Sequence, residues 1–363
     1  LKFLQFPSTD TAPCCLFVAL PMRLTSVFPL LALGDQPEPL PAPGRTGTIR
    51  HASRAGGGVA LHPAALEGRD GEGLEIRYWV DHPSKEDWVG LWKADEDINK
   101  VSPYKLQMLE KDPAYLVHGT GRLNFTVVNL RADLKACLFR GGLEQPEHFG
   151  GAAEARVENK QLPTQRRVAL GKEGWSVAWS GGSHPQHLQY RVGNGEWKTT
   201  PAARHTYSAA DMCGAPATEE GWRWTGDIHE GVIPYESAPV TYKVGSDRTG
   251  WTEEATIHPR PTPESTVSIL AFGDLGQADD DDSMESTFDG SFPSGELPSV
   301  NTTNGLRKEL LDGPQVVIHN GDLAYALGYA SIWDQFFAQI EPVASRVPWM
   351  VTVGNHERDW EGS

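Results

Sequence analysis

Three short motifs in the last quarter of the chain constrain its fold more than any other feature. They span residues 273–276 (GDLG), 321–325 (GDLAY) and 354–357 (GNHE), and each follows a run rich in apolar, β-branched or aromatic residues. These runs, at 267–272, 315–319 and 349–353, predict buried strands, and helical patterns at 303–311 and 331–344 alternate with them. Strands that alternate with helices predict an open α/β sheet, whose loops at the carboxyl ends of the strands hold ligands.

Five side chains in these motifs are the candidate site residues. Asp274 and Asp322 follow separate strands of the expected sheet, so their carboxylates can converge despite their distance in sequence. Such anionic oxygens suit two metal ions about 3.5 to 4 Å apart, an arrangement that hydrolyses phosphate esters. Tyr325 can turn back toward the same cation, and its phenol becomes a ligand when a ferric ion displaces the proton. Asn355 offers a neutral oxygen to a divalent metal, and His356 can contact phosphate or protonate a leaving group.

The pairing of Gly276 with Tyr325 carries a family resemblance. In most calcineurin-like metallophosphoesterases a His of an Asp-x-His motif stands at the position of Gly276. With Gly276 and Tyr325 together, the chain resembles the purple acid phosphatases, a branch of that superfamily, and in particular their large, plant-type members. The resemblance covers roughly residues 74–359, and it also includes the stretches 212–217 (MCGAPA), 221–223 (GWR), 328–329 (GY) and 333–336 (WDQF).

The resemblance implies a role for each candidate residue. Asp274 and Tyr325 would bind Fe(III), Asp322 would bridge both metals, and Asn355 would bind a divalent ion, which is Zn, Mn or Fe in the family. His356 would contact the substrate. The family's remaining ligands are three histidines of two later motifs, Val-x-x-His and Gly-His-x-His, and this sequence ends before either. We therefore expect the chain to be a C-terminally truncated fragment that is inactive alone.

The sequence upstream of the motifs predicts two all-β regions. Short runs with β-branched and aromatic residues recur between turn signals, which is typical of β-sandwiches. Trp175, Val177 and Trp179 alternate in one such run, so they are expected on one buried face. We predict two fibronectin-III-like sandwiches followed by the N-terminal half of an α/β metallophosphoesterase domain. The predicted ranges are 1–58 for a leader and Pro/Gly-rich linker, 59–160 and 161–262 for the two sandwiches, and 263–363 for the partial phosphatase domain.

Composition limits the partners. The formal net charge of −16 and the absence of a Lys/Arg cluster argue against nucleic acid. The apolar segments near the start are interrupted by Pro21, Arg23 and Pro29, so no membrane span is expected, and the leader is either signal-like or unstructured. Two Asn-x-Thr sequons, at Asn124 and Asn301, fit a glycosylated protein that is secreted, extracellular or vacuolar. With four cysteines and no CxxC spacing, neither a disulfide framework nor a thiolate zinc site is expected.

Several other polar residues have a simpler interpretation. The acidic run 279–282 lies in a Ser/Gly/Pro-rich stretch, where clustered like charges are typical of a solvated loop. Glu357 is expected to be structural, and nothing in the spacing around His319 indicates more than a role in supporting neighbouring residues or a position at the surface.

The motifs and the resemblance lead to two hypotheses of different class. The first is an acid phosphatase with a binuclear metal centre, which acts on phosphate monoesters. The second is a non-catalytic binding protein made of β-sandwich modules and a degenerate phosphatase half. A phosphodiesterase or pyrophosphatase on the same metals is a further alternative, and a homodimer remains open as a partner.

Overall fold

The computed structural model describes residues 50–51, 56–261, 266–284, 297–309 and 316–357 of the 363-residue chain. The chain divides into two units, Leu1–Pro41 and Ala42–Ser363, and every described residue belongs to the second unit. Most of the predicted leader therefore lies outside the described residues. Within the range predicted for the leader and linker, β1 (Arg50–His51) pairs in parallel with β9, and β2 begins at Gly57.

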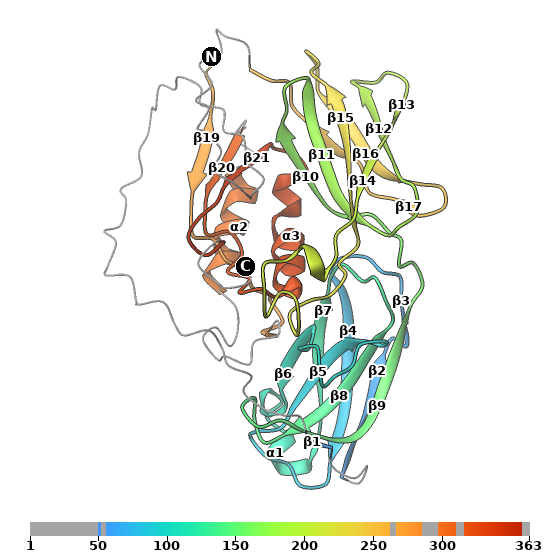
Figure 1. Cartoon of the computed structure of the whole chain (residues 1–363), viewed down its shortest axis with the longest axis vertical. Helices are drawn as coiled ribbons and strands as arrows, with labels where there is room; N and C mark the ends of the chain where they lie inside the picture. The colour runs from blue at the N-terminus through green and yellow to red at the C-terminus, as the bar shows by residue number, and fades with distance from the viewer. Residues whose placement is uncertain (1–49, 52–55, 262–265, 285–296, 310–315, 358–363) are drawn as a thin grey trace, which may run out of the picture. The chain divides into compact units, whose positions relative to one another are not determined.

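The strands β2 to β9 form the N-terminal β module, which consists of two sheets (Figure 1). One sheet has the order β2-β4-β7, with β2 (Gly57–His62), β4 (Glu72–Val80) and β7 (Thr120–Val127). The other sheet, which also includes β1, has the order β1-β9-β8-β5-β6, with β9 (Glu147–Val157), β8 (Leu134–Arg140), β5 (Trp88–Lys93) and β6 (Lys105–Met108), and β3 (Ala65–Leu66) pairs with β9. The short helices η1 (Leu109–Lys111) and α1 (Tyr115–His118) follow β6. Apolar side chains of both sheets belong to one buried cluster, which is the core of this module.

The strands β10 to β18 form the second β module, again from two sheets. The first comprises β10 (Thr164–Leu170), β11 (Gly174–Gly181), β15 (Asp227–Pro234) and β14 (Ala203–His205). The second comprises β13 (Lys198–Pro201), β12 (His187–Val192), β16 (Val240–Ser246), β17 (Gly250–Trp251) and β18 (Ala255–Ile257), and η2 (Ala209–Asp211) lies in the connection after β14. Trp175, Val177 and Trp179 are all buried in its core, which confirms the predicted face.

The last part of the described chain is an α/β unit. Its parallel sheet has the order β19-β20-β21, with β19 (Ile269–Phe272), β20 (Val316–Asn320) and β21 (Trp349–Thr352). The helices α2 (Leu297–Glu309) and α3 (Ala330–Ala344) contribute to the apolar cluster on one face of this sheet. Helix α2 starts six residues before the predicted start at residue 303, because its Pro298 lies in the first turn, where proline is tolerated.

Helix α3 contacts both β modules through polar groups. The amide of Asn129 donates to Asp334 Oδ1 at 2.6 Å, and Arg166 forms an ion pair with Glu341 at 2.7 Å. The hydroxyl of Tyr242 donates to the carbonyl of Ser345 at 2.7 Å. Helix α3 therefore fixes the α/β unit against both β modules.

Candidate metal centre

The three predicted motifs follow the carboxyl ends of β19, β20 and β21, so the parallel sheet brings their loops to one edge. Asp274 N–H donates to the carbonyl of Gly321 at 3.2 Å. In the same way, the N–H of Leu275 donates to the carbonyl of Asp322 at 3.1 Å, and the N–H of Gly276 donates to the carbonyl of Leu323 at 3.0 Å. The first and second loops are thus hydrogen-bonded side by side, as the sequence predicted for neighbouring strands.

Two glycines allow the second and third loops to approach closely. Gly321 has φ +80°, and a Cβ there would lie 2.7 Å from the Cα of Gly354. A Cβ on Gly354 would lie 2.1 Å from Asp322 Oδ1. Real Cβ atoms do not approach other atoms this closely, so both positions require glycine if the Asp322 carboxylate is to sit against the third loop.

Three of the predicted ligands adopt left-handed backbone conformations. Asp274 has φ 56°, Asp322 has φ 51° and Tyr325 has φ 51°. This region is uncommon for residues other than glycine, although Asp tolerates it better than Tyr. Strain of this kind concentrates where a loop must aim a side chain at a ligand, which is consistent with a binding role for these loops.

Tyr325 connects the first two motifs. Its hydroxyl donates to Asp274 Oδ1 at 3.3 Å, so two predicted ligands 51 residues apart in sequence meet in the structure. Its ring lies 4.5 Å from the ring of His356, measured between centroids. Asp274 is exposed and Asp322 and Tyr325 are half-buried, which leaves these oxygen atoms accessible to a bound ion.

Asp322 and His356 are also joined, but through the backbone. The N–H of His356 donates to Asp322 Oδ1 at 3.0 Å. The His356 ring nitrogen Nδ1 is buried and has no hydrogen-bond partner among the described residues. His356 therefore contacts Tyr325 through its ring and Asp322 through its backbone N–H.

Glu357 supports this arrangement, in agreement with its predicted structural role. Its carboxylate accepts hydrogen bonds from the N–H groups of Asp322 at 3.0 Å, Leu323 at 2.8 Å and Gly354 at 2.8 Å. One side chain thus satisfies donors of both the second and the third loop. Two of these partners, Asp322 and Leu323, could not be inferred from the sequence, because they lie more than 30 residues before Glu357.

His319 lies beneath the loops in the core of the α/β unit. Its ring packs 4.8 Å from Phe272 and 5.9 Å from Trp349, measured between centroids, and it is fully buried. Burial lowers the pKa of His319 to about 4, so the ring is neutral at ordinary pH. Of the two roles that the sequence left open, burial excludes a position at the surface and agrees with a supporting role.

Asn355 is exposed, and among the residues that the structure describes no hydrogen bond joins its side chain to the other predicted ligands. Within the same residues, no group of three His, Cys, Asp or Glu side chains could hold a metal ion. The two predicted ligands whose side chains meet are Asp274 and Tyr325, through the carboxylate and the phenol, whereas the carboxylate of Asp322 accepts from the N–H of His356. This set of hard oxygen donors fits an iron site, since a ferric ion accepts carboxylate and phenolate oxygens.

The expectation that the acidic run 279–282 is a solvated loop was wrong for two of its members. The side chains of Asp279 and Asp281 are only 6% and 7% exposed, and both face the buried ammonium of Lys105. Asp280 and Asp282 are exposed. Sequence reasoning missed Lys105 altogether, because it lies 174 residues before its partner Asp279.

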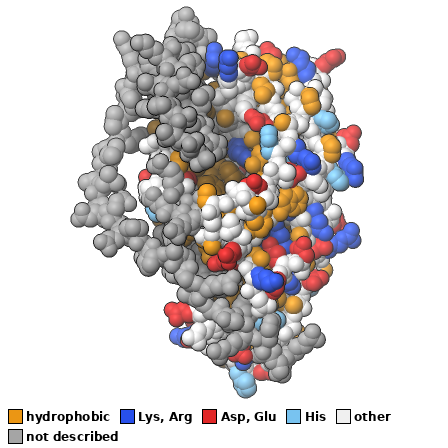
Figure 2. Space-filling model, in the orientation of Figure 1, with side chains coloured by type: hydrophobic (Ala, Val, Ile, Leu, Met, Phe, Trp, Pro, Cys, Tyr) orange, Lys and Arg blue, Asp and Glu red, His pale blue; other side chains and the backbone are white. Residues whose placement is uncertain are grey.

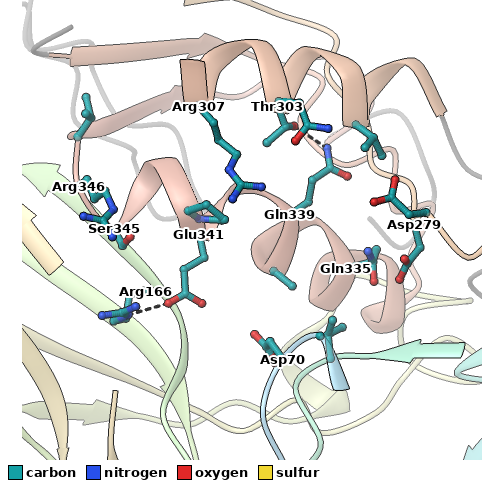
Figure 3. A pocket seen from close by; sticks show the side chains of 18 of the residues that line it. Asp70, Arg166, Asp279, Thr303, Arg307, Gln335, Gln339, Glu341, Ser345 and Arg346 are labelled. Carbon is teal, nitrogen blue, oxygen red and sulfur yellow. Dashed lines mark hydrogen bonds and ion pairs between the residues drawn. The ribbon is translucent and has the colours of Figure 1, made fainter. Parts of the chain in front are cut away.

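A cavity of about 1180 Å³ lies at the junction of α2, α3 and both β modules (Figure 3). Its charged lining includes Asp70, Arg166, Arg307 and Glu341, and none of the predicted metal ligands lines it. On the face shown in Figure 2, basic and acidic side chains are interspersed. None of the described helices is long and apolar enough to cross a membrane.

Comparison with known proteins agrees with the geometry. A family model described as calcineurin-like phosphoesterase matches residues 267–363. "Probable inactive purple acid phosphatase 1" of Arabidopsis thaliana is 36% identical over 339 residues, which cover 84% of this chain and 54% of that protein. "Probable inactive purple acid phosphatase 27" of the same plant is 33% identical over 344 residues, which cover 84% of this chain and 54% of that protein.

A solved structure matches over nearly the same part of the chain. The purple acid phosphatase PPD1 from yellow lupin (Lupinus luteus) seeds superposes with a TM-score of 0.74 at 32% identity, covering 85% of this chain and 58% of that one. The chain spans about half the length of the curated relatives it matches. On the agreement of motifs, fold and relatives, the chain belongs to the purple acid phosphatase family and contains a calcineurin-like metallophosphoesterase domain.

Proposed function

We propose that this chain supplies the first part of a binuclear metal centre that hydrolyses phosphate monoesters at acid pH. The observation that supports this most is the 3.3 Å contact between Tyr325 and Asp274. A phenol that donates to a carboxylate of a different motif occupies the position from which both oxygens could bind one ferric ion. An ordinary turn at Asp274 would not require a tyrosine from the next loop.

The residues divide into those that would hold metal and those that would hold substrate. Asp274 and Tyr325 would bind Fe(III), Asp322 would bridge, and Asn355 would bind the divalent ion, which we propose is Zn, Mn or Fe. Bound metals of this kind supply positive charge for the phosphoryl oxygens and lower the pKa of water. The ring of His356 packs beside that of Tyr325. From this position it would donate a hydrogen bond to phosphate or a proton to the leaving oxygen.

Iron binding by the 363-residue chain tests the proposal directly. After reconstitution with Fe(III) and Zn²⁺, we expect a visible tyrosinate-to-iron absorption band that is lost in Tyr325→Phe. Tyr235→Phe is the matched control, since the hydroxyl of Tyr235 donates to Gly171 in the second β module. A band that persists in Tyr325→Phe, or a wild-type chain that binds no iron, would contradict the proposal.

Turnover of p-nitrophenyl phosphate at acid pH tests the chemistry. The resemblance assigns the imidazole ligands to motifs later than the third, so we expect activity only from a longer chain that carries those histidines. In that chain, Asp322→Asn should abolish turnover. A longer chain with both later motifs that binds iron but does not turn over the substrate would favour the second candidate.

The second candidate is a non-catalytic binding protein. It is favoured by the printed names of the two curated relatives, each of which is called a probable inactive purple acid phosphatase. On this alternative the β modules, which we propose to be fibronectin-III-like, would carry the function, and the loops of the α/β unit would be remnants. The iron and turnover measurements above separate the two candidates.

We also propose that the protein is secreted, extracellular or vacuolar and carries N-linked glycans. Both sequon asparagines, Asn124 on β7 and Asn301 on α2, are exposed. Expression in a eukaryotic secretory system, followed by enzymatic deglycosylation, tests this. Loss of the mass shift in Asn124→Gln or Asn301→Gln would identify the site, and no shift in the wild type would contradict the proposal.

A further inference from the structure

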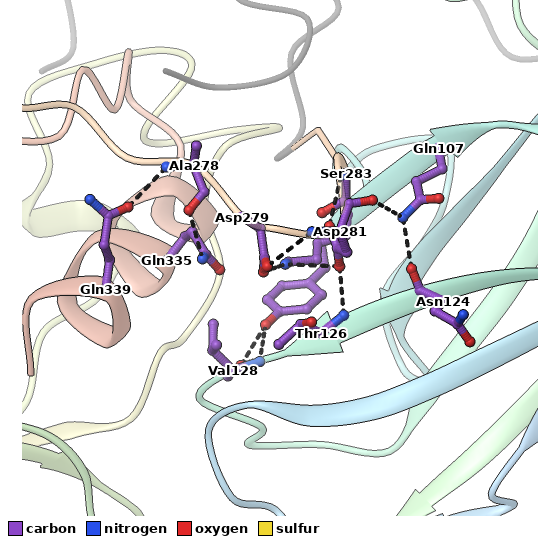
Figure 4. Close-up of polar contacts among 12 residues, drawn as sticks. Gln107, Asn124, Thr126, Val128, Ala278, Asp279, Asp281, Ser283, Gln335 and Gln339 are labelled. Atoms are coloured by element: carbon purple, nitrogen blue, oxygen red, sulfur yellow. Dashed lines mark hydrogen bonds and ion pairs between the residues drawn. The ribbon is translucent and has the colours of Figure 1, made fainter. Parts of the chain in front are cut away.

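The acidic segment, defined here as residues 279–284, docks onto the N-terminal β module (Figure 4). The ammonium of Lys105 on β6 has no exposed surface, and it forms an ion pair with Asp279 and lies 3.7 Å from Asp281 Oδ2. Three charged groups are therefore buried together where β6 meets the segment. Such an arrangement is stable only when the geometry of the charges is well defined, because each charge loses its hydration.

Main-chain hydrogen bonds extend this contact. Leu106 and Met284 exchange two N–H to carbonyl bonds of 2.9 Å, so the segment adds an antiparallel bridge to the edge of β6. The carboxylate of Asp281 accepts from the N–H of Thr126 at 2.5 Å, and its carbonyl accepts from the Gln107 amide at 3.0 Å. The segment is thus held by side chains and backbone of two strands, β6 and β7.

The same stretch of chain begins at the first motif, residues 273–276. Asp274 lies five residues before Asp279, and Leu275 and Gly276 are bonded to the second loop. Ala278 is then bonded to α3, because its N–H donates to Gln339 at 2.9 Å and its carbonyl accepts from Gln335 at 3.3 Å. Between Asp274 and Met284 the chain is therefore anchored to three parts in turn: the Asp322 loop, helix α3 and the N-terminal β module.

We propose that Lys105 and the acidic segment position Asp274 for metal binding, so that the N-terminal β module forms part of the support of the metal centre. This inference rests on the proposed function, because it concerns the same aspartate. The side chain of Asp274 is exposed, and the residue after it, Leu275, is buried in the core of the α/β unit and bonded to the second loop. The contact of the acidic segment with Lys105 holds the other end of this short stretch of chain.

Two other interpretations of the acidic segment are weaker. A second metal site is disfavoured because the carboxylates of Asp279 and Asp281 already face the Lys105 ammonium, and that of Asp281 also accepts from the N–H of Thr126. A contact that only joins the β module to the α/β unit would not affect Asp274. This last interpretation is the one that the experiment must exclude.

The experiment compares Lys105→Met with Lys111→Met in the full 363-residue chain. Lys111 is the matched control, because it also donates to the acidic segment, at the carbonyl of Asp282, but is exposed. In Lys105→Met, we expect hydrogen exchange at the amides of Leu275 and Gly276 to accelerate by about tenfold or more, because their loop loses its anchor. We also expect weaker Fe(III) binding and a shifted tyrosinate band, while Lys111→Met changes neither.

The outcomes separate positioning from simple attachment. Faster exchange confined to the acidic segment, with Leu275, Gly276 and the tyrosinate band unchanged, would overturn the proposal. If Lys105→Met does not fold, the double variant Lys105→Gln/Asp279→Asn removes one buried charge of each sign and is measured in its place, with the same expected changes. If the wild-type chain binds no iron, the proposed function fails, and the exchange measurement alone still decides whether Lys105 holds the Asp274 loop.

Discussion

Two pairs of aspartates, Asp274 with Asp322 and Asp279 with Asp281, have opposite surroundings. Asp274 and Asp322 lie at the edge of the parallel sheet, where one is exposed and the other half-buried. Asp279 and Asp281 have side chains only 6% and 7% exposed, and they face Lys105. The second pair is buried against donors of the protein itself, whereas the side chains of the first pair are exposed or half-buried.

The difference lies in where the donors come from. The buried pair receives an ammonium and a backbone N–H from the N-terminal β module. The site pair receives a tyrosine hydroxyl and the N–H of His356, both from the other loops of the site. Carboxylates with a full set of protein partners stabilise a fold, and those with spare oxygen atoms are available for metal. The comparison therefore predicts large effects on stability for one pair and small effects for the other.

The largest loss of stability is expected for Asp279→Ala. It removes the carboxylate that pairs most closely with the buried Lys105 ammonium and leaves Asp281 Oδ2 at 3.7 Å, and the loss of one partner of a buried ion pair costs about 3 to 5 kcal/mol. Asp280→Ala is the matched control, because the neighbouring residue is exposed, and it should stay within about 0.5 kcal/mol. Urea unfolding measures the free energy of unfolding of both variants. Equal losses in the two would show that the buried ion pair contributes no more to stability than an exposed aspartate.

Asp70 is intermediate between these two kinds of aspartate, because among the described residues one of its carboxylate oxygens has a hydrogen-bond partner and the other has none. Its Oδ1 accepts from the N–H of Asn129 at 2.6 Å, and its Oδ2 is buried without a partner among the described residues. Burial, followed by the nearby Glu341 carboxylate, raises the pKa of Asp70 to about 7. Asp70 is therefore protonated in the folded state at pH values where it is ionised in the unfolded chain.

The sign of the pH dependence follows from this raised pKa. Below the unfolded pKa of 3.8, Asp70 is protonated in both states and does not reduce the free energy of unfolding. As the pH rises toward the folded pKa of about 7, the unfolded chain loses this proton more readily than the folded one, so the free energy of unfolding falls. Asp70→Asn keeps an uncharged group there, so it should match the wild type near pH 4 and be more stable at pH 8, by up to about 4 kcal/mol. Asp95→Asn, at an exposed position, is the control. A constant difference between Asp70→Asn and the wild type over this pH range would contradict the assignment.

A smaller effect is expected for Glu357→Gln. The neutral amide keeps the shape of the side chain but replaces an ionised acceptor of three backbone N–H groups, which should cost about 1 to 3 kcal/mol. The loss should be local, with faster hydrogen exchange at Asp322, Leu323 and Gly354. Glu236→Gln, in a loop of the second β module, serves as the control. Unchanged exchange at the three amides would mean that the carboxylate does not organise the loops.

The sequence was sufficient to place the three motifs at one edge of a sheet, but not to predict the distant residues that contact their loops. Asp274, Asp322 and Tyr325 could be predicted because each motif follows a strand within a few residues, and parallel strands deliver their carboxyl ends to one edge. Trp175, Val177 and Trp179 could be predicted because a strand alternates its faces. In both cases the information is local in the sequence.

The burial of Asp279 could not be predicted in this way. Its environment depends on Lys105, and nothing local distinguishes that lysine from any other on a strand. The run of four aspartates indicated a solvated loop because like charges repel, and a buried cation from a separate module reverses that inference. Helix α2 also begins earlier than the helical pattern from residue 303 indicated, with Pro298 in its first turn, where proline is tolerated.

The smallest effect on stability is expected for Asp274→Asn, although it should have the largest effect on metal binding. Asp274 is exposed, and among the described residues its side chain accepts the 3.3 Å bond from Tyr325, which an asparagine oxygen can also accept. Without metal, the free energy of unfolding should therefore change by less than about 0.5 kcal/mol. With Fe(III), the same variant should lose most of its affinity, because a neutral amide is a poor ligand for a hard trivalent ion. A chain in which Asp274→Asn destabilised the fold as much as Asp279→Ala, or bound iron like the wild type, would remove the distinction between the two pairs of aspartates.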